Sequence, residues 1–452
     1  MDSKMTTGRP MPILLKFVLP IFAGFVFQQF YNMVDTVIVG RFVGPGALAA
    51  VGSTGTIMFL IMGIANGMTT GYTVLISQKY GAGDKEGTRK SFVNAILLGI
   101  ISTAIVTVVA VTLMHPILRI MNTPADIYND AYDYIFTICA GSIVLIGYNL
   151  FAASLRAIGN SRTPLYFLIF AALLNIVLDL VLIVGFGMGT FGAALATDIS
   201  QGVSAILCII YIVKKVDVLR PKKGDWKLDS KYTALQLNIG IPMALQFGIT
   251  ASGTMVMQSS INVYGSVAVG GFTAAGKVVN IMTSGMPSIG QTMAAYVGQN
   301  YGAGDLDRVH KGTRDAMIIM SIYSIVTAVL SVVLLPHIIG LFFDSGVDLN
   351  VYLPFAKTYL YQCVIFYIPL AMIFIYRNSM QACGFGKTAL ALGFMELAAR
   401  LVTAAISFKV GSYAVAVAGD AVAWLSTGIF SWVLYLFVLK TLRKQMNALR
   451  QA

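Results

Sequence analysis

The chain has 452 residues, of which 57% are hydrophobic and only 11% are charged. A soluble domain carries about 25% charged residues, so this composition excludes an ordinary soluble protein and indicates one that lies in a lipid bilayer. The formal net charge of +12 would suit a nucleic-acid-binding protein, but the distribution of the basic residues along the chain argues against that partner.

A helix that crosses a bilayer needs about 20 predominantly apolar residues. Twelve such segments are predicted, at 13–38, 46–76, 91–113, 131–155, 163–184, 189–213, 234–262, 270–298, 315–336, 352–376, 386–408 and 412–438. We therefore expect a six-helix bundle at 1–213, a cytoplasmic linker at 214–233 and a second six-helix bundle at 234–452. The predicted fold class is an all-α integral membrane protein with 12 transmembrane helices in two pseudo-symmetric bundles.

The two halves of the sequence share motifs at matching positions. YGAGD begins at Tyr80 and again at Tyr301, and LRAIGNSRTP, which begins at Leu155, resembles MQACGFGKTA, which begins at Met380. The two offsets, 221 and 225 residues, are close to half the chain length. Internal repeats of this size are typical of transporters, in which two related bundles move against each other around a shared site.

Lysine and arginine are distributed unequally between the predicted loops. With both termini inside, 25 of them fall in cytoplasmic segments and only four fall outside, namely Arg41, Arg119, Lys357 and Lys409. This bias orients membrane proteins, so we expect a multi-pass protein of the plasma (inner) membrane with both termini cytoplasmic. The basic linker and C-terminal tail are interpreted as topology determinants, with contact to anionic lipid as the alternative.

Several enzymatic and cofactor-dependent functions require motifs that the sequence does not contain. The four cysteines include no CxxC pair, the three histidines show no metal-ligand spacing, and no GxxxxGK[ST] phosphate-binding loop is present. We therefore expect no enzymatic activity, no cofactor and no metal other than a transported ion. An unrelated twelve-span major-facilitator carrier stays open as an alternative, whereas nothing in the sequence indicates the selectivity ring of a channel.

Charged residues inside the predicted spans are the main candidates for function, because each costs about 3 kcal/mol or more at membrane depth. They are Asp35, Asp179, Asp198, Lys277, Glu396, Arg400 and Asp420. The three carboxylates of the first half all fall in the outer part of their spans. Such a concentration of negative charge predicts a binding site for a cation.

Neighbouring polar residues support this cation site. Asn175 stands four residues before Asp179, on the same helix face, and Thr197 adds a hydroxyl group. Carboxylate, amide and hydroxyl oxygens suit Na⁺, and clustered carboxylates can also hold a proton. We therefore predict that Asp35, Asn175, Asp179, Thr197 and Asp198 bind a coupling ion, Na⁺ or H⁺. The alternative is that the acids only reach the outer membrane interface or cap helix ends.

The charges of the second half are expected to pair with one another. Glu396 and Arg400 are four residues apart on one predicted helix, and Lys277 and Asp420 lie at similar depths in two other spans. Buried opposite charges that pair are more often structural than functional, so this group is a weaker candidate for coupling.

Pro20 lies inside the first predicted span, about four turns from Asp35. A proline removes a backbone hydrogen bond and bends a helix, so Pro20 is a candidate hinge. Its counterpart in the second half, Pro242, has no acid in its span and is interpreted as a packing kink.

The chain also contains 22 methionines, many of them in the predicted spans. Flexible, polarizable methionine surfaces suit the binding of diverse ligands, but methionine is also ordinary packing material. The sequence alone does not show which methionines face a cleft.

The two six-span halves, with GAGD turns after the second and eighth spans, resemble the multidrug and toxic compound extrusion (MATE) transporters over essentially the whole chain. The spacing of Pro20 and Asp35, followed by Asn175, Asp179 and Thr197, is similar to the cation site of the DinF-like branch. The resemblance implies that these residues surround Na⁺ or a proton. The NorM-like branch has essential acids in spans seven and ten, and this chain has none there, so that site is not expected.

The resemblance also implies a V-shaped pair of bundles around a central cleft. Its expected function is the export of organic cations and other xenobiotics by antiport with Na⁺ or H⁺ through alternating access. The two halves already form a complete unit, so a monomer is expected to suffice. The main alternative is a lipid-linked oligosaccharide flippase of the same superfamily, which would need several cationic residues in its cavity. The sequence offers Lys277 and Arg400, each with an acid nearby.

Overall fold

The computed structural model describes residues 5–121, 123–342 and 348–451, and the regular secondary structure in these ranges is helical. The α-helices are α1 (Pro10–Phe42), α2 (Pro45–Ser53), α3 (Gly55–Gly81), α4 (Lys85–Ile120), α5 (Tyr128–Ala140), α6 (Ser142–Ala157), α7 (Arg162–Asp179), α8 (Gly189–Lys215), α9 (Ser230–Asn262), α10 (Gly265–Thr283), α11 (Gly285–Gly302), α12 (Leu306–Ile338), α13 (Leu349–Ile365), α14 (Tyr367–Ala382), α15 (Lys387–Val410) and α16 (Tyr413–Gln451). Three short elements complete them: the π-helix η1 (Leu180–Gly185) and the 3₁₀-helices η2 (Lys223–Asp225) and η3 (Ile339–Phe342).

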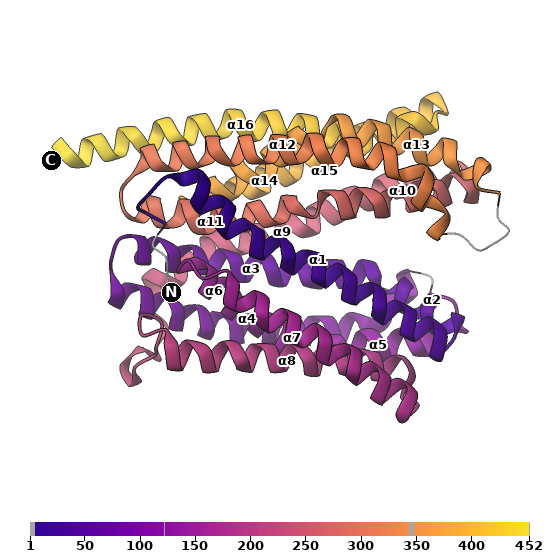
Figure 1. Cartoon of the computed structure of the whole chain (residues 1–452), viewed down its shortest axis with the longest axis horizontal. Helices are drawn as coiled ribbons and strands as arrows, with labels where there is room; N and C mark the ends of the chain where they lie inside the picture. Colours follow the sequence, from indigo (N-terminus) through magenta and orange to yellow (C-terminus); the bar gives the residue numbers. More distant parts are fainter. Residues whose placement is uncertain (1–4, 122, 343–347, 452) are drawn as a thin grey trace.

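The helices run roughly along the long axis of the molecule (Figure 1). The first half of the chain, coloured indigo to magenta, lies on one side, and the second half, coloured salmon to yellow, lies on the other (Figure 1). Helix α1 runs obliquely between them. The first and last described residues lie at the same end, where the segment between α8 and α9 also lies, and we call this the linker end.

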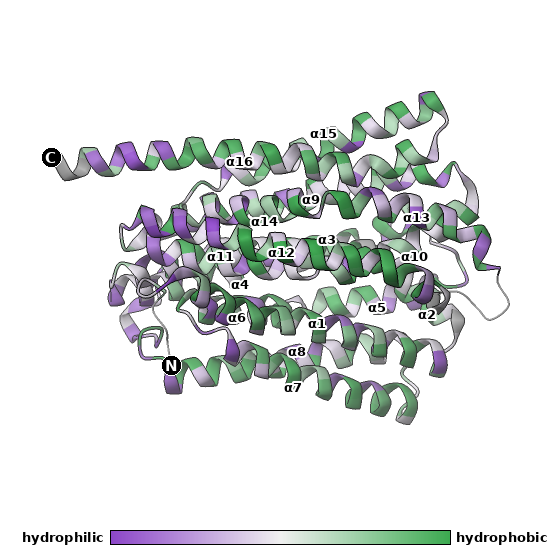
Figure 2. Ribbon diagram, turned by 45° about the horizontal axis from the view of Figure 1, so that its top comes forward, coloured by the Kyte–Doolittle hydropathy of each residue, from purple (hydrophilic) through white to green (hydrophobic). Residues whose placement is uncertain are grey.

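Nine helices in the described part of the chain are long and apolar enough to cross a membrane. Two further pairs, α5 with α6 and α13 with α14, would each form one bent span, with angles of 48° and 50°. These eleven candidates correspond to eleven of the predicted spans. The remaining prediction, 270–298, is formed by α10 and α11, which are helical but too polar to qualify by composition. Hydrophobic residues line most of the helix length, and hydrophilic residues gather toward the ends (Figure 2).

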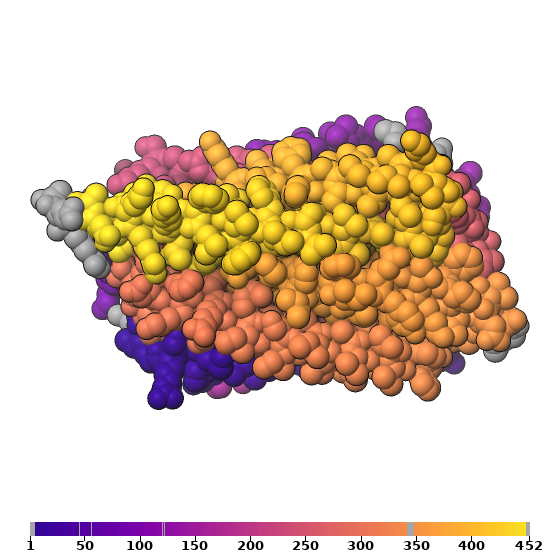
Figure 3. All heavy atoms as spheres, turned by 90° about the horizontal axis from the view of Figure 1, so that it is seen from above, coloured from indigo at the N-terminus to yellow at the C-terminus, as the bar shows by residue number. Residues whose placement is uncertain are grey.

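The bundle presents apolar side chains to its surroundings. Figure 3 shows a face formed mainly by the second half of the chain, with α16 (yellow) extending along it. Ile429, Leu436 and Phe437 of α16 are exposed, and the Phe437 side chain is 64% exposed. Exposed apolar residues on long apolar helices are what a lipid-facing surface requires, and the protein is therefore a multi-pass membrane protein.

The repeated YGAGD motif forms the turns that lead into α4 and α12. Gly83 and Gly304 have φ angles of 77° and 76°, a left-handed conformation that glycine adopts without strain. Asp84 and Asp305 cap the following helices, because each carboxylate accepts a hydrogen bond from the N–H three residues later, at 2.7 and 2.9 Å. The repeat is thus confirmed as a pair of turns with the same local geometry.

Residues two positions before each YGAGD motif also meet the second motif pair across the interface between the two halves. The Gln78 Nε2 atom donates to the Ala382 carbonyl at 2.7 Å, and the Gln299 Nε2 atom donates to the Ala157 carbonyl at 2.8 Å. Gln78 and Gln299 are repeat equivalents, and so are Ala157 and Ala382. The two hydrogen bonds are therefore related by the internal symmetry of the chain, and both lie at the linker end.

Two glycines allow this close approach. A side chain at Gly81 would overlap the main chain of Gln299, and a side chain at Gly302 would overlap the main chain of Gln78. The contact continues along α3 and α9, where a methyl group at Gly67 would come within 2.7 Å of the Ala244 nitrogen. Small residues let helix backbones pack closely in membranes, so the two halves are closely packed from the linker end to about the middle of these helices.

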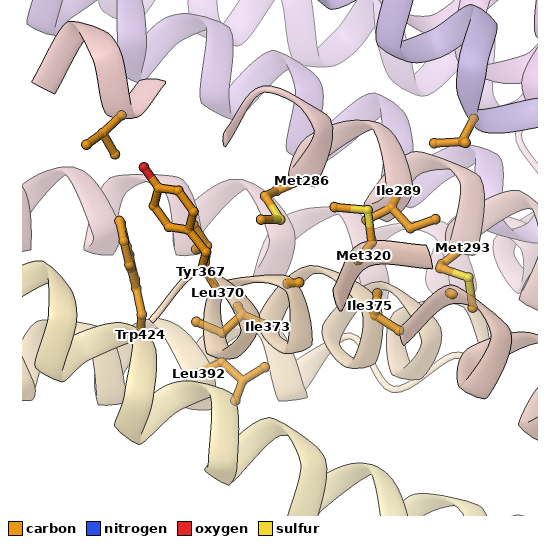
Figure 4. Close-up of a cluster of buried hydrophobic side chains, with 14 of the residues drawn as sticks. Met286, Ile289, Met293, Met320, Tyr367, Leu370, Ile373, Ile375, Leu392 and Trp424 are labelled. Carbon is orange, nitrogen blue, oxygen red and sulfur yellow. The ribbon is translucent and has the colours of Figure 1, made fainter. Parts of the chain in front are cut away.

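The largest hydrophobic core belongs mainly to the second half. Met286, Met293 and Met320 lie among Ile289 and Ile375 in this core (Figure 4). The methionines that the structure places here are packing residues and do not face a cleft. The start of the chain joins the same core, because Met5, Leu14, Phe17, Val18 and Ile21 pack into it. Helix α1 therefore contacts both halves.

The linker is held against α4 by an ion pair. The Arg89 Nε and Asp225 Oδ2 atoms are 2.6 Å apart, and the Asp225 side chain is 5% exposed. Burial acts to raise the pKa of Asp225, but hydrogen bonds from Arg89 and from the Lys222 N–H outweigh it and lower this pKa below its ordinary value. The ionised carboxylate is therefore the form that stabilises the linker.

We expect the stabilising effect of this ion pair to depend on pH. A lowered folded-state pKa contributes stability above the unfolded-state pKa, about 4, and the contribution is lost as the pH falls through the folded value. Asp225→Asn should therefore lower the free energy of unfolding by about 1 kcal/mol at neutral pH and by less at about pH 3. Thermal unfolding of the two proteins in detergent at both pH values measures this, and an equal loss at both would contradict it.

Candidate functional site

The acids predicted to bind a cation form a buried pair. Asp35 lies in α1 and Asp179 ends α7, and their side chains are within hydrogen-bonding reach of each other. Asp35 is 8% exposed and Asp179 is fully buried. The Oδ1 atoms of both residues are buried and have no hydrogen-bond partner among the described residues. Buried polar atoms are normally satisfied, so these two oxygens are available to a bound proton or cation.

Asn175 and Thr197 complete this arrangement. When the Asn175 amide is turned to satisfy both its atoms, Nδ2 donates to Asp179 Oδ2 and Oδ1 accepts from the Thr197 N–H, each at 3.3 Å. The Thr197 hydroxyl donates to the Ala193 carbonyl of its own helix at 3.1 Å. Thr197 therefore contacts Asn175 through its main chain, whereas the sequence suggested a role for its hydroxyl. The structure brings Asp35, Asn175, Asp179 and Thr197 together, and we call them the acid-pair site.

The backbone changes form at this position. Helix α7 ends at Asp179 and continues directly as the π-helix η1. A π-helical turn widens the helix and is frequent at functional sites. The π-helical turn begins one residue after Asp179, so it lies where it can position the Asp179 carboxylate.

Three polar residues that were not predicted from the sequence pattern lie around the acid-pair site. Tyr31 and Tyr134 are buried and lie within electrostatic range of both carboxyl groups. Gln201 of α8 lies within reach of the Tyr31 hydroxyl, and its own Oε1 atom is buried without a hydrogen-bond partner among the described residues. Tyr31 precedes Asp35 by four residues, so helical periodicity could have placed it on the same face.

Asp198 is separate from the acid-pair site. Its carboxylate packs against Gly141, where α5 and α6 meet, and a side chain on Gly141 would overlap it. Asp198 is half-buried, and the described interactions of Asp35 and Asp179 do not include it. The prediction grouped all three acids because their depths match. Asp198 shares Tyr134 as a neighbour with Asp35 and Asp179, but it makes no described contact with either carboxylate.

A pocket of about 80 Å³ lies beside the acid-pair site. It is lined by Pro20, Ile21, Gly24, Phe25, Gln28, Met62, Asn66, Leu145, Tyr148, Asn149, Arg156, Ser161, Pro164, Leu165, Leu168, Gln201 and Gln291. All except Gln291 of α11 come from the first half of the chain. Gln201 lines the pocket and also lies near Tyr31, so this residue connects the pocket with the surroundings of the acid-pair site. Pro20 lines the same pocket within an uninterrupted α1.

The charged residues of the second half form a separate buried cluster. Arg400 Nη2 is 3.0 Å from Asp420 Oδ1, and Arg400 Nη1 is 3.5 Å from Glu396 Oε2. Tyr359 also donates to Asp420 Oδ2 at 2.8 Å, and Arg377 Nη1 is 4.0 Å from Glu396 Oε1. Two arginines thus balance two carboxylates, which favours a structural role for this cluster.

Two sequence-based expectations about this cluster were wrong. Asp420 pairs with Arg400, and Lys277 is exposed on α10 and makes no ion pair among the described residues. The depths of Lys277 and Asp420 agreed, but depth does not specify which helix face a side chain occupies. The predicted span 352–376 ends one residue before Arg377, so Arg377 was expected in a cytoplasmic loop. In the structure Arg377 lies within α14 and is buried.

We expect the cluster to be essential for stability. Arg400→Met should lower the free energy of unfolding by about 3–5 kcal/mol, because it leaves Asp420 and Glu396 buried without their partner. Lys277→Met is the matched control, because Lys277 is exposed, and it should change the free energy of unfolding by about 0.5 kcal/mol or less. Thermal unfolding in detergent measures both variants. Similar losses of stability in Arg400→Met and Lys277→Met would show that the buried ion pairs do not stabilise the protein.

A duplicated, all-helical membrane protein with a buried acid pair beside a pocket has the architecture of a secondary transporter. The chain belongs to the family described as MatE, whose sequence model matches residues 20–181 and 242–406, one segment in each half. It is 32% identical over 307 residues to the probable multidrug resistance protein YpnP of Bacillus subtilis, covering 67% of this chain and 68% of the relative. It is 29% identical over 353 residues to the probable multidrug resistance protein YoeA of the same organism, covering 75% and 74%.

Solved structures show the same fold. A MATE crystal structure in the bent conformation superposes with a TM-score of 0.90 at 20% identity, covering 98% of each chain. A MOP superfamily transporter from Pyrococcus furiosus gives 0.90 at 21% identity, covering 97% of this chain and 98% of the other. The predicted family and fold class are thereby confirmed.

Proposed function

We propose that the protein exports drug-like compounds from the cell by antiport with Na⁺ or H⁺. The observation that carries this proposal is the acid-pair site, whose two unpartnered carboxylate oxygens are buried beside a pocket. Names of relatives such as YpnP and YoeA, both probable multidrug resistance proteins, support the substrate class. A single chain contains both halves, so we propose that it works as a monomer.

The acid-pair site can hold either ion. A proton would be shared by Asp35 and Asp179, since two carboxylates this close cannot both be ionised without a large cost. Na⁺ would instead use oxygen ligands, and the carboxylates of Asp35 and Asp179 and the Asn175 amide oxygen are the groups within the site that can supply them. Either ion removes the cost of leaving the carboxylates unpartnered.

Coupling requires only that ion and drug favour opposite conformations or compete for one region. Gln201 offers a connection, because it lines the pocket and lies near Tyr31, which is within electrostatic range of both acids. A drug that moves Gln201 would alter the surroundings of Asp35 and Asp179. The pocket is small compared with the roughly 300–1,000 Å³ typical of drug-sized ligands, so binding a whole drug needs the halves to move apart.

We place the linker end in the cytoplasm, in the plasma membrane, because the basic residues gather there. The symmetric hydrogen bonds of Gln78 and Gln299 hold that end closed. This arrangement supports a state that faces outward, in which the ion would enter as the drug leaves.

Transport by the purified protein in liposomes tests the proposal. An imposed Na⁺ gradient or an imposed pH gradient should move rhodamine 6G, a fluorescent organic cation, against its own gradient, and the effective gradient identifies the ion. No movement under either gradient, across a panel of organic cations and with folded protein, would contradict the proposal.

A flippase for lipid-linked oligosaccharides is the second candidate. The buried Arg377 and the pocket residue Arg156 add cationic groups to Lys277 and Arg400, the two that the sequence pattern places within the spans. Failure of all organic cations, combined with transfer of a lipid-linked pyrophosphate sugar across the same liposomes, would favour this candidate.

A further inference from the structure

Arg156 occupies a central position that neither the fold nor the acid-pair site explains. It lies in the last turn of α6 and lines the pocket described above. It also lines a second, smaller pocket of about 20 Å³ between α3, α6 and α11, where the two halves meet. Its half-buried side chain therefore stands at the boundary between the two pockets.

The Arg156 guanidinium has no partner of opposite charge. Its ionisable neighbours are Tyr148 and Cys208, and none of the described carboxylates pairs with it. The other buried arginines differ, since Arg377 and Arg400 each lie within 4.0 Å of a Glu396 oxygen. An unpaired cation in a low-dielectric site is costly, and the charge-dipole attraction at the end of α6 offsets only part of that cost.

The remaining lining of the two pockets is neutral. Gln28, Asn66, Asn149, Gln201 and Gln291 contribute amide groups, and among the described lining residues there is no carboxylate. Amides donate and accept hydrogen bonds without favouring either sign of charge. The pocket is therefore net positive, which is the reverse of what a site selective for cations alone would need.

The internal repeat shows that the fold does not require this charge. The position equivalent to Arg156 in the second half is Gln381, at the same offset of 225 residues that relates the two motifs. Gln381 is 1% exposed, so a neutral amide fills the corresponding site in α14. Arg377, one turn before Gln381 in α14, is also buried, but it faces Glu396 at 4.0 Å. A buried arginine without such a partner points to a ligand.

We propose that Arg156 binds an anionic group, a carboxylate or a phosphate, carried by the transported molecule. Guanidinium groups recognise these planar or tetrahedral anions through paired hydrogen bonds, and a pocket of about 80 Å³ has room for such a group. The inference rests on the proposed function and predicts that, among its substrates, molecules that combine an acidic group with an apolar body bind most tightly. Zwitterionic drugs satisfy this requirement, and so do anionic lipids.

Two related dyes test the proposal. Rhodamine B carries a free carboxylate at neutral pH, whereas rhodamine 6G carries an ethyl ester there and also differs in its amine and ring alkyl groups. The comparison between wild type and variant for each dye is therefore the decisive one. Binding of each dye to the purified protein in neutral-lipid nanodiscs is followed by fluorescence polarization. Wild type should bind rhodamine B more tightly than rhodamine 6G. Arg156→Gln, which copies the residue at the equivalent position, should weaken rhodamine B at least tenfold and change rhodamine 6G by less than twofold.

Arg162→Gln is the control, because it removes the same charge from an exposed position at the same end of the bundle. It should leave the affinity for both dyes unchanged. Equal weakening of the two dyes by Arg156→Gln, or equal weakening of rhodamine B by both variants, would overturn the proposal. Equal affinity of the wild-type protein for the two dyes would by itself overturn the proposal that Arg156 binds an anionic group. Transport of rhodamine 6G by wild type with no preference for rhodamine B would reject this inference and leave the proposed function standing.

Nanodiscs that contain phosphatidic acid distinguish the two sources of the anion. If a lipid phosphate occupies Arg156, phosphatidic acid should weaken rhodamine B binding to wild type and have no effect on Arg156→Gln. If the anion belongs to a soluble substrate, phosphatidic acid should leave the affinity for rhodamine B unchanged in both proteins. Weakening of rhodamine B by phosphatidic acid to the same extent in wild type and Arg156→Gln would contradict a specific role for Arg156.

Discussion

Asp35→Asn and Asp179→Asn should each abolish ion-driven transport. Both substitutions keep the size of the side chain but remove the charge, and an amide can neither take up a proton nor neutralise Na⁺. Because the two carboxyl groups act as one site, loss of either should reduce uphill dye movement in liposomes at least a hundredfold, which corresponds to about 2.7 kcal/mol. Downhill exchange of dye should be reduced less, since it does not need the ion gradient.

Asp198→Asn is the matched control for this pair. Asp198 is an acid at similar depth in the same half, but it packs against Gly141 and is not part of the acid-pair site. Uphill transport by Asp198→Asn should stay within about threefold of wild type, less than 1 kcal/mol. Intact transport by Asp35→Asn and Asp179→Asn in correctly folded protein would reject the acid-pair site as the coupling site.

Gly81→Ala should open the linker end. The added methyl group would overlap the main chain of Gln299, which cannot yield without displacing α11. If the overlap costs about 1.4 kcal/mol, the open population rises about tenfold. A variant without the four native cysteines, which are all buried, provides the background for labelling. In this background, a membrane-impermeant thiol reagent added from the linker side should modify Ser77→Cys at least about tenfold faster when Gly81→Ala is present.

Gly276→Ala controls for the cost of changing a helical glycine. A methyl group at Gly276 meets no atom within 4 Å, so labelling of Ser77→Cys should stay at the background rate. An unchanged rate in Gly81→Ala, or an equal increase in both variants, would show that the close packing of the two halves does not keep this end closed.

Patterns within single helices predicted much of the acid-pair site. Asn175 and Asp179 follow the four-residue spacing of one helix face, and the cost of a buried charge singles out Asp35. The repeat likewise predicted the turns at Gly83 and Gly304, because an identical five-residue motif implies identical local geometry. These inferences succeed because they depend on helix periodicity and on the lipid environment.

Contacts between helices could not be predicted in the same way. Arg400 and Lys277 were both plausible partners for Asp420, and only the packing of α15 on α16 brings Arg400 to within 3.0 Å of it. Asp198 had the right depth for the acid pair but lies against Gly141. Arg156 stands at the end of a predicted span, where sequence cannot distinguish a loop residue from one that turns into a pocket.

The same limit applies to the surface shared by the two halves. The sequence shows Gly81 and Gly302 as members of a repeated turn, but it does not show that each packs on the other's neighbouring helix. Helix α11 falls in the predicted span 270–298 but is more polar than the other spans, and its contacts account for this polarity. Its Gln291 lines the pocket and its Gln299 bonds Ala157 across the interface.

The most direct test of the central claim is whether drug binding expels an ion from the acid-pair site. Rhodamine 6G is added to the purified protein in weakly buffered detergent, and the release of protons is followed with a pH indicator and that of radiolabelled Na⁺ by filtration. We predict release of one of these ions from wild type and none from Asp35→Asn or Asp179→Asn. Equal release from wild type and both variants, or binding of the dye to wild type without release of either ion, would contradict the account.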